Sequence, residues 1–191
     1  MEITLRDFVT MLHGMLFGGF FLMALVGAFV LLLDWSDSKR CEEHSMRLPP
    51  VPTWQKVYFV AMAGCGWAAV LSGAYVIYPW YRAIAPHGAD LTLYPKALLL
   101  SNPNTAGWHA LGMEWKEYVA WIAPMAATMV AFVMTKHRGA WNASCRVRNS
   151  VMAFAAAAFL AAGIAGGLGA MIDKAAPVQG GKAVQLMRAG R

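Results

Sequence analysis

The sequence predicts an all-α integral membrane protein, a four-helix transmembrane bundle with a long loop between its second and third helices. Composition is the first reason. Of 191 residues, 59% are hydrophobic and 14% are charged, whereas soluble domains carry about 25% charged residues. Four apolar runs are the second reason, because roughly 20 apolar residues in a helix cross the hydrocarbon core. The predicted spans are 8–33, 57–78, 112–135 and 150–172.

The first two spans combine small residues with very few ionisable ones. Span 8–33 holds His13 and, close to it, Gly14 and Gly18. An imidazole inside an apolar helix needs a hydrogen-bond partner, a metal or a polar cavity. Span 57–78 has no Asp, Glu, Lys, Arg or His, and it also contains glycines. These small residues would admit a flat cofactor or a neighbouring helix, and the sequence leaves both open.

The loop before the third span contains an apolar piece, 91–104, that is too short to cross a membrane. We expect it to form a small amphipathic helix in the interface or to fold back over the bundle. In span 112–135, Pro124 removes a backbone donor and predicts a kink. Separately, the third helix could start before residue 112, near Thr105, with Asn104 or Thr105 as its N-cap.

The fourth span, 150–172, carries small residues at a spacing of four in two adjacent rows. The rows are Ala153, Ala157, Ala161, Ala165 and Gly169, and Ala158, Ala162, Gly166 and Ala170. Such rows let helices approach closely in lipid, so they predict a packing face. We expect one transmembrane domain, 1–174, followed by a mobile basic tail, 175–191, that contains Pro and Gly.

The basic residues predict the orientation of the chain. Four spans place both termini on one side of the membrane, together with the 79–117 loop. The two sides carry equal numbers of basic residues: Lys39, Arg40, Arg47, Lys56, Lys136, Arg138, Arg146 and Arg148 on one, and Arg6, Arg82, Lys96, Lys116, Lys174, Lys182, Arg188 and Arg191 on the other. When Lys182, Arg188 and Arg191 on the outer part of the tail are left out, the first side has more basic residues than the second. The positive-inside rule then places both termini on the non-cytoplasmic side, in the inner membrane if the chain is bacterial.

Ionisable chemistry is concentrated at 104–124, "NTAGWHALGMEWKEYVAWIAP", directly before and into the third apolar run. His109 would approach the same side of the bundle as His13. Two neutral imidazoles from different helices could ligate a b-type haem iron as paired metal ligands. This plan resembles small four-helix membrane b-type cytochromes in architecture. Because His109 precedes the apolar run by several residues, this plan requires helix three to start early, near Thr105, or the loop to turn inward.

The same hypothesis gives roles to neighbouring residues. Gly14 and Gly18 would give a porphyrin room, and Arg82, Lys96 or Trp108 would meet its propionates. The three cysteines form no CxxCH motif, so covalent haem is not indicated.

Glu114 and Glu117 are three residues apart and therefore neighbours on one helical face. We assign them as candidate catalytic groups that accept protons from a quinol or relay them. With His13 and His109 they are also the candidates for a zinc or copper site, which needs three or four ligands. Alternatively, they pair with nearby basic residues while the surrounding aromatic residues form an interfacial belt.

Three functions therefore stay open. The first is a haem b-binding or quinol-linked electron-transfer subunit of a respiratory-type complex. The second is a non-catalytic accessory subunit that packs through the fourth helix. The third is a small transporter or metal-handling protein. The expected partners are the lipid bilayer, a larger membrane complex or a second copy, and a quinone. The net charge of +6 is spread over loops and tail beside headgroups, so no nucleic-acid partner is expected.

Overall fold

A computed structural model describes residues 2–41, 52–181 and 183–185. Within them, four helices are long and apolar enough to cross a membrane. They are Leu5–Ser36, Thr53–Tyr81, Pro103–Lys136 and Cys145–Ala175. The prediction of a helical chain with four long apolar helices is confirmed. Each helix runs beyond the predicted span because polar end residues continue the same backbone hydrogen bonding.

Several of these helices are built from consecutive segments. The first comprises α1 (Leu5–Met11), η1 (Leu12–Gly19) and α2 (Phe20–Cys41). The second comprises α3 (Thr53–Ser72), η2 (Gly73–Ile77) and α4 (Tyr78–Tyr81). The third comprises α6 (Pro103–Gly107), η4 (Trp108–Gly112), η5 (Trp115–Val119) and α7 (Ile122–Lys136). The fourth is α9 (Cys145–Ala175), and α8 (Arg138–Ala143) joins it to α7.

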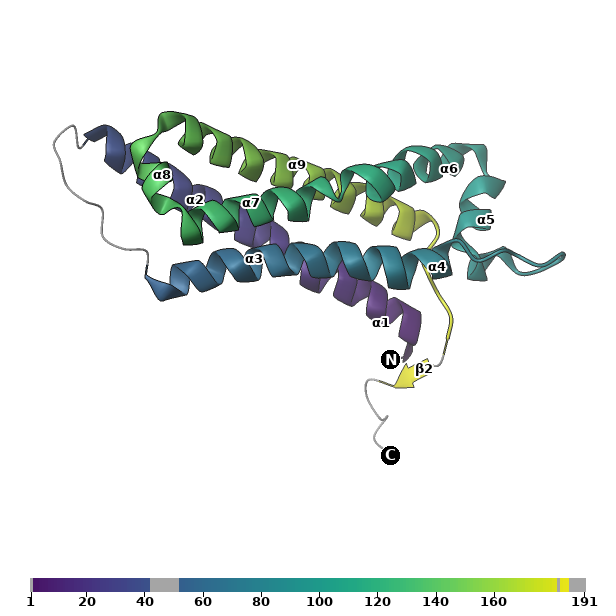
Figure 1. Cartoon of the computed structure of the whole chain (residues 1–191). Coiled ribbons are helices and arrows are strands. Elements are labelled where there is room, and N and C mark those ends of the chain that lie inside the picture. The colour runs from purple at the N-terminus through teal and green to yellow at the C-terminus, as the bar shows by residue number, and fades with distance from the viewer. Residues whose placement is uncertain (1, 42–51, 182, 186–191) are drawn as a thin grey trace.

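The four helices lie side by side, and successive helices run in opposite directions (Figure 1). Each packs against the next in the chain, and α9 closes the arrangement by packing against α2. Leu25, Phe59, Val130 and Ala155 are fully buried where the helices meet. Alanines of α7 and α9 line this core, and their small side chains allow close approach of the backbones. The core therefore occupies the middle of the bundle.

The third helix begins at Pro103, well before the predicted start at 112, so the earlier start is correct. Its N-cap is Asn102, whose side chain accepts a hydrogen bond from the backbone N–H of Asn104 at 2.9 Å. Proline at the first helical position fits this start, since the missing N–H has no partner there. Pro124 lies in the first turn of α7, where a missing N–H removes no interior hydrogen bond.

The loop between the second and third helices folds back onto the end of the bundle. It contains a 3₁₀ turn, η3 (Leu91–Leu93), and a short helix, α5 (Pro95–Ser101). Leu99 of α5 is 1% exposed and belongs to a second buried cluster with Tyr81, Met113 and Ile172. The apolar piece is therefore a cover over one end of the bundle.

The tail differs from the predicted mobile segment in the part that is described. Strand β2 (Ala183–Gln185) pairs antiparallel with β1 (Glu2–Thr4), with Ile3 opposite Val184. Before it, Ala176 and Val178 are buried in the second cluster. The chain's first and last described segments therefore meet at one end of the bundle. Residues 182 and 186–191 lie outside the described residues, as does Arg47 among the charges used for orientation.

Candidate functional site

Polar side chains gather where the second helix ends and the third begins, beneath the cover formed by α5. We call this group the polar cluster and define it as Tyr78, Tyr81, Arg82, His109 and Glu117. The second helix supplies the tyrosines and the arginine, and the third supplies the histidine and the glutamate. Apolar contacts around Tyr81 hold the two helix ends together. The cluster therefore depends on the packing of two helices that are distant in sequence.

One arm of the polar cluster is centred on Tyr78. Its hydroxyl donates to Glu117 Oε1 at 2.6 Å and accepts from Arg82 Nη1 at 2.5 Å. The guanidinium also lies over the Tyr78 ring, 5.3 Å from its centroid. Tyr78 thus links a carboxylate to a cation, and short hydrogen bonds with a charged partner are the stronger kind. This arm can hold a proton, or pass one, between the Tyr78 phenol and the Glu117 carboxylate.

The second arm joins Tyr81 and His109. A 2.7 Å hydrogen bond connects Tyr81 Oη to His109 Nδ1, and the two rings lie 5.9 Å apart between centroids. Tyr81 is 3% exposed, whereas His109 is half-buried. Because Nδ1 is engaged by the phenol, the ring orientation is set and Nε2 is the nitrogen left for a ligand or a proton.

His13 lies apart from the polar cluster, against the second helix. Its Nδ1 is 3.0 Å from Ser72 Oγ, and that hydroxyl donates to the carbonyl oxygen of Ala69 at 3.1 Å. Since the hydroxyl has one hydrogen, His13 Nδ1–H is the donor to Ser72. Gly73 makes room for the ring: a Cβ built there would be 2.7 Å from His13 Cε1. The predicted need for a polar partner is met by Ser72.

Lys116 and Glu117 are adjacent in sequence but point to different partners. Glu117 joins the polar cluster, whereas Lys116 runs along α9, with its Nζ 3.0 Å from the position of a Cβ at Gly169. The ammonium interacts electrostatically with Asp173 and with His13. A second charged group therefore lies between the helices at this end of the bundle.

Widened helical turns coincide with these residues. Four of the described segments are π-helical, namely η1, η2, η4 and η5. They contain His13, Gly73, His109, Lys116 and Glu117. Short π-helical segments inside α-helices are rare and occur often at functional sites. Their concentration around these ionisable residues favours a functional interpretation over a purely structural one.

The remaining predicted site residues do not all join this group. Glu114 is exposed, and its carboxylate makes no hydrogen bond within the described part of the chain. Trp108 packs beside the second buried cluster. Gly14 is exposed and has no atom within 4 Å of a built Cβ, while the nearest atom to one at Gly18 is the His13 carbonyl oxygen at 3.5 Å. The two glycines therefore form no crevice with a neighbouring helix.

The arrangement does not fit paired histidine ligation of one haem. His13 is bonded to Ser72 and His109 to Tyr81, positions nine residues apart on the second helix. That separation corresponds to roughly 13 Å along a helix at 1.5 Å per residue. Two imidazoles on one metal would need their Nε2 atoms within about 4 Å, twice a typical metal–nitrogen distance. Haem b stays a prediction that this geometry does not favour.

Other metal chemistry has no support in the described residues. In the parts of the chain that the structure describes, no three His, Cys, Asp or Glu side chains lie close enough to hold a metal ion. The predicted set of His13, His109, Glu114 and Glu117 is therefore not a four-ligand site. Glu114 is exposed, and Glu117 is bonded to Tyr78.

Ser72, Tyr78 and Tyr81 contact the predicted site residues His13, Glu117 and His109, and the sequence did not predict these contacts. The stretch "YPWYR" at 78–82 carries the signal, because two phenols and an arginine follow an apolar run directly. Comparison of the chain with protein-family models, curated proteins and solved structures gives no match.

Proposed function

We propose that this chain is an integral membrane protein whose polar cluster binds a quinol headgroup and accepts its protons, within a respiratory-type electron-transfer complex. The observation that carries the proposal is the chain of short hydrogen bonds from Arg82 through Tyr78 to Glu117. Beside it, the Tyr81–His109 pair offers a second proton acceptor.

Exposed apolar side chains support insertion into a bilayer. Many large hydrophobic residues on the four long helices face outward, among them Met15, Met23, Val30 and Leu160, each at least 59% exposed. Soluble monomers rarely expose continuous apolar surfaces of this kind. In the proposed orientation, the polar cluster and both termini are on the non-cytoplasmic side. Resistance to alkaline extraction and the accessibility of a terminal tag to external protease test insertion and orientation.

The chemistry of a quinol matches the polar cluster. On oxidation, a quinol releases two protons and two electrons. Glu117 and His109 Nε2 are the proposed proton acceptors, and Tyr78 orients the Glu117 carboxylate. The two electrons pass one at a time to a one-electron redox centre of a partner subunit, which is reoxidised by the next centre between the two transfers. This chain thus supplies binding, orientation and proton acceptance.

A route from lipid to the polar cluster is provided by exposed aromatic side chains. Tyr75, one turn before Tyr78, and Tyr118, next to Glu117, are each 72% exposed, and Leu111 is 60% exposed. Amphipathic aromatic rings are favoured at the level of lipid headgroups. A quinol with an apolar tail would approach along this surface with its headgroup directed at Glu117.

The adjacent glutamates give a matched pair of variants for the test. We expect Glu117→Gln to weaken binding of a short-chain ubiquinol or menaquinol by about ten- to hundredfold, since a hydrogen bond to a charged group contributes about 1.5–3 kcal/mol. Glu114→Gln changes the same chemical group three residues away on an exposed position and should bind as wild type. Quinol titration of the purified chain in lipid nanodiscs, followed by tryptophan quenching, measures the affinities.

Two results would refute the proposal. The first is an absence of saturable quinol binding in wild type, and the second is equal affinity for the Glu117→Gln and Glu114→Gln variants. A weaker affinity in His109→Gln, with part of the wild-type pH dependence lost, would assign His109 as the second proton acceptor.

A second candidate, an accessory subunit that packs through the fourth helix, is favoured by one observation. Ala155, Ala158 and Ala161 pack inside the bundle, but Gly163, Gly166 and Gly167 have no atom within 4 Å of a built Cβ. Small residues with open space before them suit close approach of another membrane helix. Under this proposal, Gly167→Leu abolishes co-purification with a partner subunit while leaving quinol binding unchanged. Unchanged co-purification would remove this candidate.

A further inference from the structure

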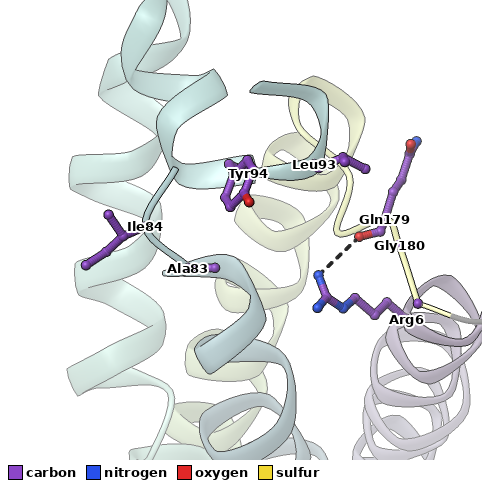
Figure 2. Close-up of a pocket in the computed structure, with 8 residues that line it drawn as sticks. Arg6, Ala83, Ile84, Leu93, Tyr94, Gln179 and Gly180 are labelled. Atoms are coloured by element: carbon purple, nitrogen blue, oxygen red, sulfur yellow. Dashed lines mark hydrogen bonds between the residues drawn. The ribbon is translucent and has the colours of Figure 1, made fainter. Parts of the chain in front are cut away.

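A cavity separate from the polar cluster lies where the chain's two ends meet the loop after the second helix. It measures about 470 Å³ and is lined by Arg6, Ala83, Ile84, Leu93, Tyr94, Gln179, Gly180 and Gly181. Figure 2 shows Arg6 reaching from the first helix toward Gln179, with Tyr94 and Ala83 on the far side. Pockets of 300–1,000 Å³ are the usual size for small-molecule sites. None of the polar-cluster residues lines it.

Arg6 is the charged group of this lining, and most of its hydrogen-bonding capacity is unused. Its guanidinium has five N–H donors. Within the described residues it donates only to the backbone oxygen of Gln179, at 3.4 Å, and lies 5.5 Å from the centroid of the Trp80 ring. The neighbouring carboxylate, Asp7, is engaged by the backbone N–H and hydroxyl of Thr4. Within the described part of the chain, the guanidinium is thus a cation with free donors beside the cavity.

The opposite side of the cavity is apolar and continues to the surface. Ile84 is 91% exposed and Leu93 is 47% exposed, although both lie outside the long apolar helices. Under the proposed membrane insertion, these two side chains lie beyond the helix ends, where they would contact acyl chains at the level of the headgroups. The cavity therefore presents a cation on one side and an acyl-compatible surface on the other.

The glycines of the lining keep space around the cation. Gly180 and Gly181 have φ values of +107° and +94°, which residues with side chains rarely adopt. A Cβ built at Gly180 would lie 3.6 Å from Arg6 Nη1. A larger side chain there would cover the guanidinium, so the backbone turn at this point leaves the donors accessible.

We propose that this cavity binds a phosphate-bearing anion, with the Arg6 guanidinium holding the phosphate and Ile84 and Leu93 contacting the adjoining apolar chain. The planar guanidinium fork matches two phosphate oxygens, which makes arginine the preferred residue for such groups. The phosphate belongs either to an anionic phospholipid or to a soluble phosphate compound. The lipid source rests on the proposed membrane insertion, whereas the soluble source does not.

The test compares arginines at opposite ends of the bundle. Arg6→Gln removes the proposed ligand, and Arg146→Gln removes an exposed arginine at the start of α9. Each purified variant is offered an equal mixture of phosphatidylglycerol and phosphatidylcholine, and native mass spectrometry counts the lipids retained. A parallel arm measures the shift in Tm caused by inorganic phosphate against chloride at equal ionic strength.

We expect wild type and Arg146→Gln to retain phosphatidylglycerol preferentially, and Arg6→Gln to lose that preference by about tenfold. Arg6→Lys keeps the charge without the planar fork and should retain an intermediate amount, which separates loss of the ligand from loss of folding. Protection of wild type and Arg146→Gln, but not Arg6→Gln, by inorganic phosphate alone would assign the site to a soluble phosphate compound. Equal lipid retention and equal phosphate response in Arg6→Gln and Arg146→Gln would overturn the proposal.

Discussion

Replacing Gly73 by alanine tests whether His13 is fixed against the second helix as the structure shows. The new Cβ would lie 2.7 Å from His13 Cε1, whereas ordinary van der Waals contacts begin at 3.4 Å. The ring must therefore move by about 0.7 Å, the difference between those two distances. Such a movement is enough to break the 3.0 Å hydrogen bond to Ser72, because N–H···O bonds fall within about 2.7–3.2 Å.

The expected cost combines two contributions. Overpacking of a well-packed position costs about 1–3 kcal/mol, and a hydrogen bond between membrane helices contributes about 0.6 kcal/mol on average. Exchanging glycine for alanine also favours a helix by about 1 kcal/mol. Gly64→Ala, on the same helix with no atom within 4 Å of its Cβ, carries only that gain. Gly73→Ala should therefore be about 2 kcal/mol less stable than Gly64→Ala.

The assay is reversible unfolding in mixed micelles, followed by circular dichroism, for both variants in wild-type and His13→Ala backgrounds. The penalty should disappear when His13 is alanine, since the clash has no partner. Equal stability of the two variants in the wild-type background would refute the reasoning. So would a penalty that persists without the histidine.

Three further predictions concern the core, a helix cap and one carboxylate. Leu25→Ala should lower the free energy of unfolding by about 2–5 kcal/mol because Leu25 is fully buried, whereas Leu33→Ala, at a side chain 51% exposed, should change it by under about 0.5 kcal/mol in the same titration. Thr4→Ala removes the hydroxyl that caps α1 and should cost about 1 kcal/mol, seen as faster amide hydrogen exchange in that helix. The backbone N–H of Thr92 holds the pKa of Asp90 below its ordinary value of 3.8. The stabilisation that the ionised Asp90 carboxylate gives the folded state is therefore present at neutral pH and is lost as pH falls through the folded-state pKa. A carboxyl carbon NMR titration in which Asp90 shows no lowered pKa would contradict this prediction.

The four long helices were predictable because apolar run length alone specifies them. The start of the third helix was harder to predict, since Asn102 and Pro103 are residue types that are also common in loops, and only the structure shows Asn102 capping a helix. The β1–β2 pairing was not predicted because three-residue strands carry no alternation that distinguishes them from coil.

The candidate site was only partly predictable for a different reason. His109 and Glu117 stand out because ionisable residues are unusual beside an apolar run. Their partners, Tyr81 and Tyr78, depend on the rotation and axial offset of two helices, which a single sequence does not specify. Glu114 was equally plausible by composition and lies exposed because the turns between it and Glu117 are not regular α-helix.

The π-helical turns of the third helix also have a consequence for how the site could change. A π turn holds more residues than an α turn, and each residue of an α-helix turns the chain by about 100°. Deleting one residue from η5 (Trp115–Val119) would let that segment become α-helical and would change how Lys116 and Glu117 within it are directed relative to α7. The alanine-lined core beyond Ile122 would keep its register. Single-residue deletions can thus change the end of the bundle that contains η4 and η5, while the packing of α7 at the other end stays the same.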